Sequence, residues 1–199
     1  MVDNLLPSCS ILILAGGRGS RMGGQDKGLV MWHGKPLINW LHSVARPLTN
    51  DLIISCNRNQ HRYAGLSDQI VSDDEKDFPG PLAGIRAGLT AARNDWLMVL
   101  PCDAPMIDHC LLADLHKAAT RGAHTPVMLR QGQQWQPLFC MIPVSVTPQI
   151  EVAWRNGARS NRDVLLSLGA VALDLSTADP RLANLNTPDL LALTPCPGT

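Results

Sequence analysis

No stretch of this sequence approaches the roughly 18 consecutive apolar residues that a membrane-spanning helix needs. No basic segment precedes the first apolar run, residues 11–14, which is only four residues long and is soon followed by arginine. This pattern is not that of a secretory signal peptide. We therefore expect a cytoplasmic protein with no membrane partner.

The sequence also has no excess of either charge, with 17 basic and 17 acidic residues. A protein that coats nucleic acid needs a broad basic surface, so we expect no nucleic-acid partner and only local recognition of anions. The six cysteines include no Cys-x-x-Cys pair and no cluster with histidine at zinc-ligand spacing. We expect reduced thiols rather than disulfides or a zinc site.

Two familiar phosphate-binding patterns are missing from the glycine-rich stretch 14–28, LAGGRGSRMGGQDKG. The dinucleotide fingerprint G-x-G-x-x-G fails because Met22 stands at its third glycine, and the P-loop fails because its lysine and hydroxyl residue are absent. The ingredients of anion binding are nevertheless there. Glycines expose backbone N–H groups, and Arg18, Arg21 and Lys27 add positive charge. The alternative is a flexible loop with solvated charges.

Short apolar runs alternate with stretches of helical periodicity. Strands are predicted at residues 11–14, 51–55, 69–71, 96–100, 125–129, 137–142 and 171–175. Helices are predicted at residues 36–45, 81–93, 109–120, 146–155, 161–168 and 188–193. This alternation indicates a single Rossmann-like α/β domain over residues 1–199, with a mostly parallel sheet and helices on both faces. A polar turn at residues 130–136 interrupts it and predicts one antiparallel excursion.

Polar residues follow the predicted strands at the edge where such folds bind ligands. Asn57 follows the second strand and suits a nucleobase edge or a turn, while Asp73 belongs to an acidic cluster after the third. Most of that cluster is expected to be solvated, with one member reaching a base or ribose. Asp103 follows the fourth strand between two prolines and suits Mg²⁺, which binds through one or two carboxylates plus substrate phosphates. Its alternative role is to cap the next helix.

Two further stretches leave alternatives open. In residues 79–84, PGPLAG, small side chains allow close approach of a flat ligand or a second backbone, or simply begin a helix. Asn184 and Asn186 stand at alternate positions before Thr187 and Pro188. They either hydrogen-bond a ligand or tie the chain into the sheet.

The stretches LAGGRGSRMGGQDKGL, PGPLAG, PCDAP and NLNTPDL occur in the order seen in molybdenum cofactor guanylyltransferases. The sequence resembles this family over nearly its whole length. The glycine-rich stretch alone is typical of the wider nucleotidyltransferase superfamily, whereas its ending at residues 23–28, taken with residues 79–84, is typical of the guanylyl branch. The resemblance implies Mg²⁺-dependent transfer of GMP from GTP to the phosphate of molybdenum-molybdopterin, with release of pyrophosphate. Cofactor-synthesis and insertion proteins are further expected partners.

The resemblance also implies roles for individual residues. The positions that match nucleotide-binding residues of the family are Leu14, Ala15, Gly16, Gly17, Lys27, Asn57, Asp73 and Asp103. Lys27 is the implied phosphate-binding lysine and Asp103 the implied metal ligand, which makes these two the predicted catalytic residues. Positions on the pterin side are Gln136, Asn184 and Asn186.

We accordingly expect a nucleotide-binding half at residues 1–105, a pterin-side half at 106–193 and a tail at 194–199. Two other activities stay open from the residues alone. One is transfer of a cytidylyl group or of a nucleotide to a sugar 1-phosphate. The other is nucleotide binding without turnover.

Overall fold

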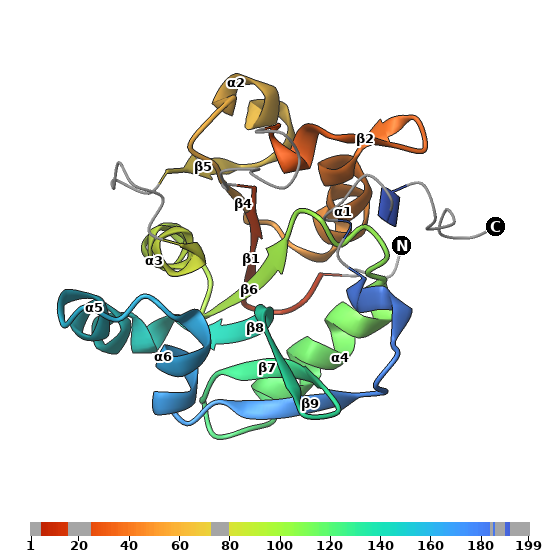
Figure 1. Ribbon diagram of the computed structural model, residues 1–199. Coiled ribbons are helices and arrows are strands. Elements are labelled where there is room, and N and C mark those ends of the chain that lie inside the picture. Colours follow the sequence, from red (N-terminus) through yellow and green to blue (C-terminus); the bar gives the residue numbers. More distant parts are fainter. Residues whose placement is uncertain (1–4, 16–24, 73–79, 184, 186–189, 192–199) are drawn as a thin grey trace.

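The computed structural model describes residues 5–15, 25–72, 80–183, 185 and 190–191. Its centre is a seven-stranded sheet with the order β5-β4-β1-β6-β8-β7-β9, seen from β5 at the top to β9 at the bottom of Figure 1. The strands are β1 (Cys9–Leu14), β4 (Leu52–Ser55), β5 (Gln69–Val71), β6 (Trp96–Pro101), β7 (Val127–Gln131), β8 (Gln134–Pro143) and β9 (Val171–Leu175). Only β8 runs antiparallel to its neighbours among these strands. The mostly parallel α/β fold with one antiparallel excursion is therefore confirmed.

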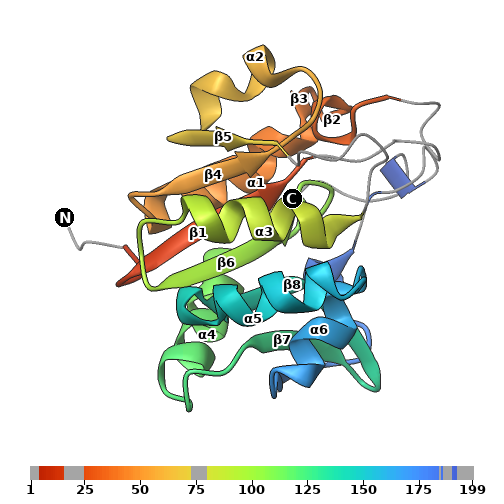
Figure 2. The ribbon, with the colours of Figure 1, turned by 90° about the vertical axis from the view of Figure 1, so that its left-hand side faces the viewer.

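Helices cover both faces of the sheet (Figures 1 and 2). One face carries α1 (Leu37–Ala45) and α4 (His109–Thr120), and the other carries α3 (Pro81–Ala91), α5 (Thr147–Arg155) and α6 (Asn161–Ser167). The short α2 (Gln60–Tyr63) follows β4. Within the described residues, no helix has the length and apolar character needed to cross a membrane.

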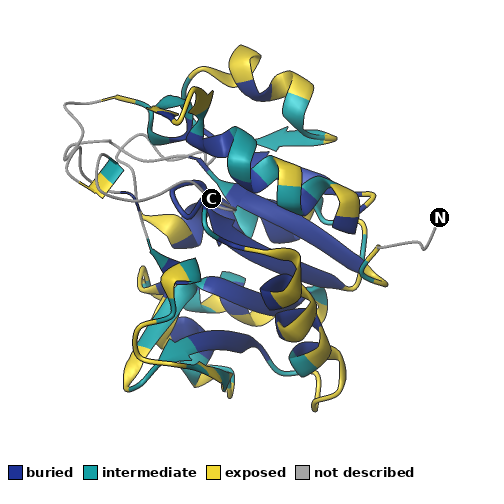
Figure 3. Ribbon diagram, turned by 90° about the vertical axis from the view of Figure 1, so that its right-hand side faces the viewer, coloured by how far each residue is buried: buried dark blue, intermediate teal, exposed yellow. Residues whose placement is uncertain are grey.

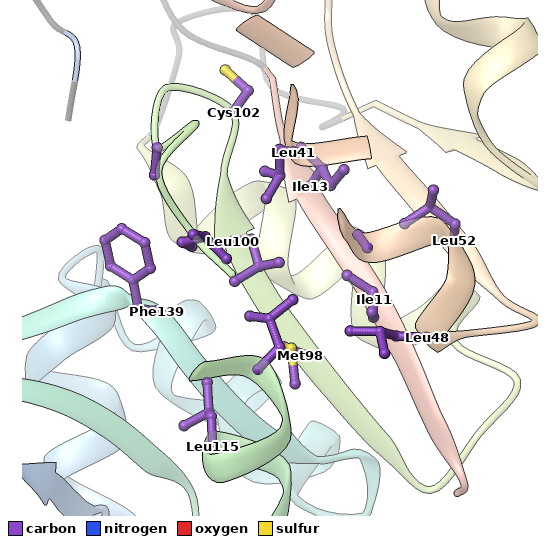
Figure 4. Close-up of a cluster of buried hydrophobic side chains, with 14 of the residues drawn as sticks. Ile11, Ile13, Leu41, Leu48, Leu52, Met98, Leu100, Cys102, Leu115 and Phe139 are labelled. Carbon is purple, nitrogen blue, oxygen red and sulfur yellow. The ribbon is translucent and has the colours of Figure 1, made fainter. Parts of the chain in front are cut away.

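The central strands are apolar on both sides because each side packs against helices. Ile11 and Ile13 face the layer of α1 and α4, whereas Leu12 between them faces α3. Figure 4 shows the cluster of buried side chains on the α1 and α4 face, in which side chains from strands and helices interdigitate. Strands β1, β4 and β6 in the middle of the sheet are buried almost throughout, whereas the edge strands β5 and β9 are only partly buried and the helices expose their outer surfaces (Figure 3).

Helix α3 lies close to the sheet because it presents glycine there. A Cβ atom on Gly84 would lie 2.7 Å from Ser55 Oγ, and one on Gly88 would lie 2.5 Å from a methyl carbon of Leu12. Gly84 of the stretch PGPLAG therefore allows the helix to approach the sheet closely. Gly80, with φ of 96°, precedes the helix in a conformation that favours glycine.

The structure differs from the sequence-based prediction in several segments. Residues 130–136 are mainly strand rather than turn, because β7 and β8 form a hairpin that turns at Gly132, where φ is 56°. A second hairpin, β2 (Met31–Trp32) and β3 (Lys35–Pro36), was not predicted because its strands are two residues long. The predicted helix 188–193 is described only at residues 190–191, which are helical. The expected division into two halves stays a prediction.

Candidate active site

Three loops start side by side at the carboxyl edge of the sheet. The ladder continues one residue past the strands, since Ala15 N donates to Ser55 O at 2.8 Å and Cys102 N donates to Leu14 O at 3.1 Å. These bonds hold the ends of β1, β4 and β6 together. The loops that carry Lys27, Asn57 and Asp103 therefore leave the sheet at one edge, as parallel strands require.

Lys27 and Asp103 meet at this edge as predicted for a shared site. Lys27 Nζ lies 3.2 Å from Asp103 Oδ2, although the residues are 76 positions apart. Asp103 is only 8% exposed, so the lysine compensates a carboxylate that is largely removed from water. A cation and an anion in contact at a sheet edge can exchange partners with a phosphate and a metal ion.

Backbone contacts hold Asp103 in place. Cys102 before it is bonded to β1, Ala104 after it is fully buried, and Asp103 O accepts a hydrogen bond from Leu185 N at 2.8 Å. The alternative role of Asp103 as a helix cap is wrong, because Asp108 caps α4 by accepting from Leu111 N at 2.7 Å. The Asp103 side chain therefore does not cap α4 and lies beside Lys27 at the carboxyl edge of the sheet.

The other predicted nucleotide contacts are placed only in part. Leu14 and Ala15 lie at the end of β1, and Asn57 follows the buried Cys56 in a half-buried position. Gly16, Gly17 and Asp73 lie outside the described residues. The structure therefore brings Ala15, Asn57, Lys27 and Asp103 to one edge.

Sequence reasoning missed the support beneath Lys27. Asp26 accepts hydrogen bonds from Tyr63 Oη at 2.5 Å and from Asn59 Nδ2 at 3.0 Å. Burial and the bond to Asp26 raise the pKa of Tyr63 far above its usual value, and burial with the nearby Asp26 charge raises the pKa of Cys56 to about 11. No pattern marks Tyr63 in advance, because its contact with Asp26 depends on tertiary structure.

Of the residues predicted for the pterin side, Gln136 lies on the β7–β8 hairpin. Gln136 pairs with Leu129 near the carboxyl end of β7, which is the edge that also carries Asp103. Its Nε2 donates to Gln131 Oε1 at 3.2 Å. Asn184 and Asn186 lie outside the described residues.

An open hollow of about 630 Å³ lies at this hairpin. Its lining consists of Gln131, Gly132, Gln133, Gln134, Trp135, Pro137, Arg162 and Thr177. Asn161 Nδ2 binds the carbonyl of Pro137 and so joins α6 to the hairpin beside the hollow. Amide groups, an indole and a guanidinium together suit a flat, polar ligand that carries negative charge.

Asp103 is the carboxylate at this edge that could take part in binding a metal ion. Among the described residues there is no group of three or more histidine, cysteine, aspartate or glutamate side chains that could hold a metal ion. A single carboxylate next to a phosphate-binding position is nevertheless the donor set with which proteins hold Mg²⁺ on nucleotides. The residues present thus fit Mg²⁺ bound jointly with a triphosphate.

Comparison with known proteins connects this geometry to one family. Residues 11–171 match the model of the MobA-like NTP transferase domain. The chain is 65% identical over 192 residues to the molybdenum cofactor guanylyltransferase of Pseudomonas aeruginosa, covering 96% of this chain and 97% of that one. It is 62% identical over 187 residues to that of Pseudomonas fluorescens, with 94% of each chain covered.

Solved structures agree in fold. Molybdopterin-guanine dinucleotide biosynthesis protein A from Archaeoglobus fulgidus superposes with a TM-score of 0.76 at 25% identity, covering 92% of this chain and 95% of that one. The 2-C-methyl-D-erythritol 4-phosphate cytidylyltransferase of Thermus thermophilus superposes with a TM-score of 0.68 at 14% identity, covering 92% and 95%. The second likeness concerns the fold alone.

Proposed function

Since this chain belongs to the MobA-like NTP transferase family, we propose that it transfers GMP from GTP to the phosphate of molybdenum-molybdopterin and releases pyrophosphate. The observation that carries this proposal is the 65% identity to a molybdenum cofactor guanylyltransferase over nearly the whole of both chains. The contact between Lys27 and Asp103 at the sheet edge supports it. A cytoplasmic location, as the sequence predicts, is part of the proposal.

The main obstacle to this reaction is repulsion between anions. The attacking phosphate is already ionised at neutral pH, so the site needs no strong general base. Lys27 brings a compact positive charge to the triphosphate and stabilises the charge that develops on the leaving pyrophosphate. Holding the two substrates in line at one edge of the sheet supplies the rest of the rate enhancement.

Asp103 is the residue that would hold Mg²⁺. When bound, the ion supplies Lewis-acid stabilisation of charge on the phosphates. Asp103 is paired with Lys27 at 3.2 Å, so each group is kept in place by the charge of the other. In the presence of GTP, Lys27 would contact the phosphates and the Asp103 carboxylate would be available to hold the ion.

The hollow at the β7–β8 hairpin is proposed as part of the acceptor site. Its glutamine amides can pair with the polar edge of a pterin, Trp135 offers an aromatic surface, and Arg162 offers a cation for a phosphate. Gln136, bonded to Gln131 of the lining, would support this wall rather than form it. In this proposal, the nucleotide site at Lys27 and Asp103 and the acceptor site at the hairpin lie along the same edge of the sheet.

The proposal is tested by pyrophosphate release with each nucleoside triphosphate, Mg²⁺ and a molybdopterin-loaded acceptor. GTP should be used far better than CTP, ATP or UTP, because a site that hydrogen-bonds one base leaves polar groups unpaired with another. Comparable kcat/KM for GTP and CTP would remove the guanylyl assignment. Release only with a sugar 1-phosphate, or binding without turnover, would favour the other two activities. Omission of Mg²⁺ should abolish release.

A further inference from the structure

The carboxylate of Asp26 is held at both of its oxygen atoms. Tyr63 Oη donates to Oδ1 at 2.5 Å, and Asn59 Nδ2 donates to Oδ2 at 3.0 Å. Both donors come from the segment after β4, Asn59 just before α2 and Tyr63 at its end. Asn59 adopts φ of 54°, a left-handed conformation that asparagine tolerates well. Asp26 thus joins the lysine-bearing loop to a different part of the sheet edge.

The short helix η2 (Lys27–Leu29) rests on the same phenol. A Cβ atom on Gly28 would lie 2.6 Å from Tyr63 Oη, so the backbone at Gly28 comes as close to the ring as glycine permits. Tyr63 itself is fully buried in the main core. A rigid side chain from the core therefore fixes the backbone on both sides of Lys27.

Asp26 does not use its carboxylate as helix-capping residues do. It occupies the N-cap position of η2, yet its side chain makes no capping hydrogen bond and turns to Tyr63 and Asn59 instead. Its backbone carbonyl accepts the first hydrogen bond of η2, from Leu29 N at 3.0 Å. The chain at η2 is therefore in contact with Tyr63 of α2 on both sides of Lys27.

We propose that Tyr63 is a positioning residue that acts through Asp26 to aim the Lys27 ammonium at the position shared by Asp103 and the triphosphate. This inference rests on the proposed function, because it assigns Tyr63 a part in the placement of a phosphate-binding lysine. We expect Tyr63 to affect the rate of the chemical step, because misplacing a charged group by about 1 Å can lower that rate on the order of 100-fold.

The test is a double-mutant cycle on the full chain with GTP, Mg²⁺ and the molybdopterin acceptor. Tyr63→Phe removes one oxygen atom and keeps the ring in the core. We expect kcat to fall roughly 10- to 100-fold, with KM for GTP changed less. In a Lys27→Ala background the same substitution should change kcat less than about twofold, because the group that Tyr63 places is gone.

A matched control is available at the opposite edge of the sheet. Ser10 Oγ donates to Asp51 Oδ2 at 2.6 Å in a fully buried contact, which is the same kind of hydroxyl-to-carboxylate bond. Because Ser10 Oγ also accepts hydrogen bonds from Asn94, Ser10→Ala should lower Tm at least as much as Tyr63→Phe does, and it should leave kcat within about twofold. If Tyr63→Phe does not fold, Asp26→Ala at a half-buried position gives the same cycle.

Each outcome has one meaning. Loss of kcat in Tyr63→Phe that disappears in the Lys27→Ala background supports the inference. If Tyr63→Phe keeps the wild-type kcat while Lys27→Ala is impaired, the inference about Tyr63 is overturned and the proposed function stays intact. The same conclusion follows if Tyr63→Phe lowers kcat equally in the wild-type and the Lys27→Ala backgrounds. Full activity of Lys27→Ala contradicts the role of Lys27 in the proposed function itself.

Discussion

Lys27→Ala should destabilise the substrate-free protein as well as slow its reaction. From the sequence alone, Lys27 is a surface lysine whose removal costs within about half a kcal/mol. The structure changes this expectation. Lys27 Nζ is 3.2 Å from Asp103 Oδ2, with the two side chains 28% and 11% exposed, so the variant leaves a largely desolvated carboxylate without this cation.

The magnitude follows from this partial burial. An exposed ion pair contributes about 0–1 kcal/mol, and breaking a fully buried one costs about 3–5 kcal/mol. This pair lies between the two cases, so the free energy of unfolding should fall by about 2 kcal/mol. For a chain of this size that lowers Tm by roughly 4–8 °C. The reaction should lose roughly two to three orders of magnitude in kcat/KM, as when one transition-state donor is removed.

The assay is thermal unfolding without nucleotide or metal, with kinetics measured well below Tm. Lys117→Ala, at an exposed position of α4, is the control and should match the wild type in both measurements. Adding Asp103→Asn to Lys27→Ala should restore part of the lost Tm, because a neutral amide needs no cation. A Lys27→Ala protein with wild-type Tm would refute the account of the ion pair, and one with wild-type kinetics would return Lys27 to a solvated loop charge.

Three further predictions concern other sites. Asp103→Asn should fold and lose nearly all turnover, measured by pyrophosphate release, because an amide is a poor Mg²⁺ ligand. Activity within a few-fold of the wild type would exclude Asp103 as the metal ligand. Asp51→Ala should lower the free energy of unfolding by about 3 kcal/mol in denaturant titration and spare kcat, because buried donors lose their partner. This buried carboxylate accepts hydrogen bonds from Ser10, Gln69 and the Arg93 backbone at the far edge of the sheet, and a wild-type midpoint would contradict the prediction. Iodoacetamide at about pH 8 should label exposed Cys110 well before buried Cys56, because the raised pKa of Cys56, about 11, keeps it a neutral thiol. Equal labelling rates, measured by peptide mass spectrometry, would contradict the burial of Cys56.

The fold could be predicted from periodicity because burial fixes it. The run at residues 96–100 is apolar at every position, which is typical of a strand covered on both faces, and β6 is such a strand. Predicted ends were less accurate. The helix predicted to reach residue 93 ends at Ala91, because the backbone N–H of Arg93 donates to the Asp51 carboxylate instead. Such a tertiary contact leaves no mark in local sequence.

The candidate site divides in the same way. Lys27 and Asp103 could be predicted to share an edge, because parallel strands place their following loops together. Tyr63 could not, because its role depends on the close approach of Gly28 to its ring. The two strands of the β7–β8 hairpin were predicted, but residues 130–136 between them were predicted as a turn because they are polar, although most of them lie in β7 or β8.

At the proposed site, the α-phosphoryl group of GTP is expected to move, with its guanosine, to the acceptor phosphate. The most direct measurement compares the reaction of α-labelled and γ-labelled GTP with the molybdopterin acceptor, and follows the label. The account predicts that the α label appears in the dinucleotide product and the γ label in pyrophosphate. A γ label on the acceptor, or an acceptor that gains no guanosine, would contradict it.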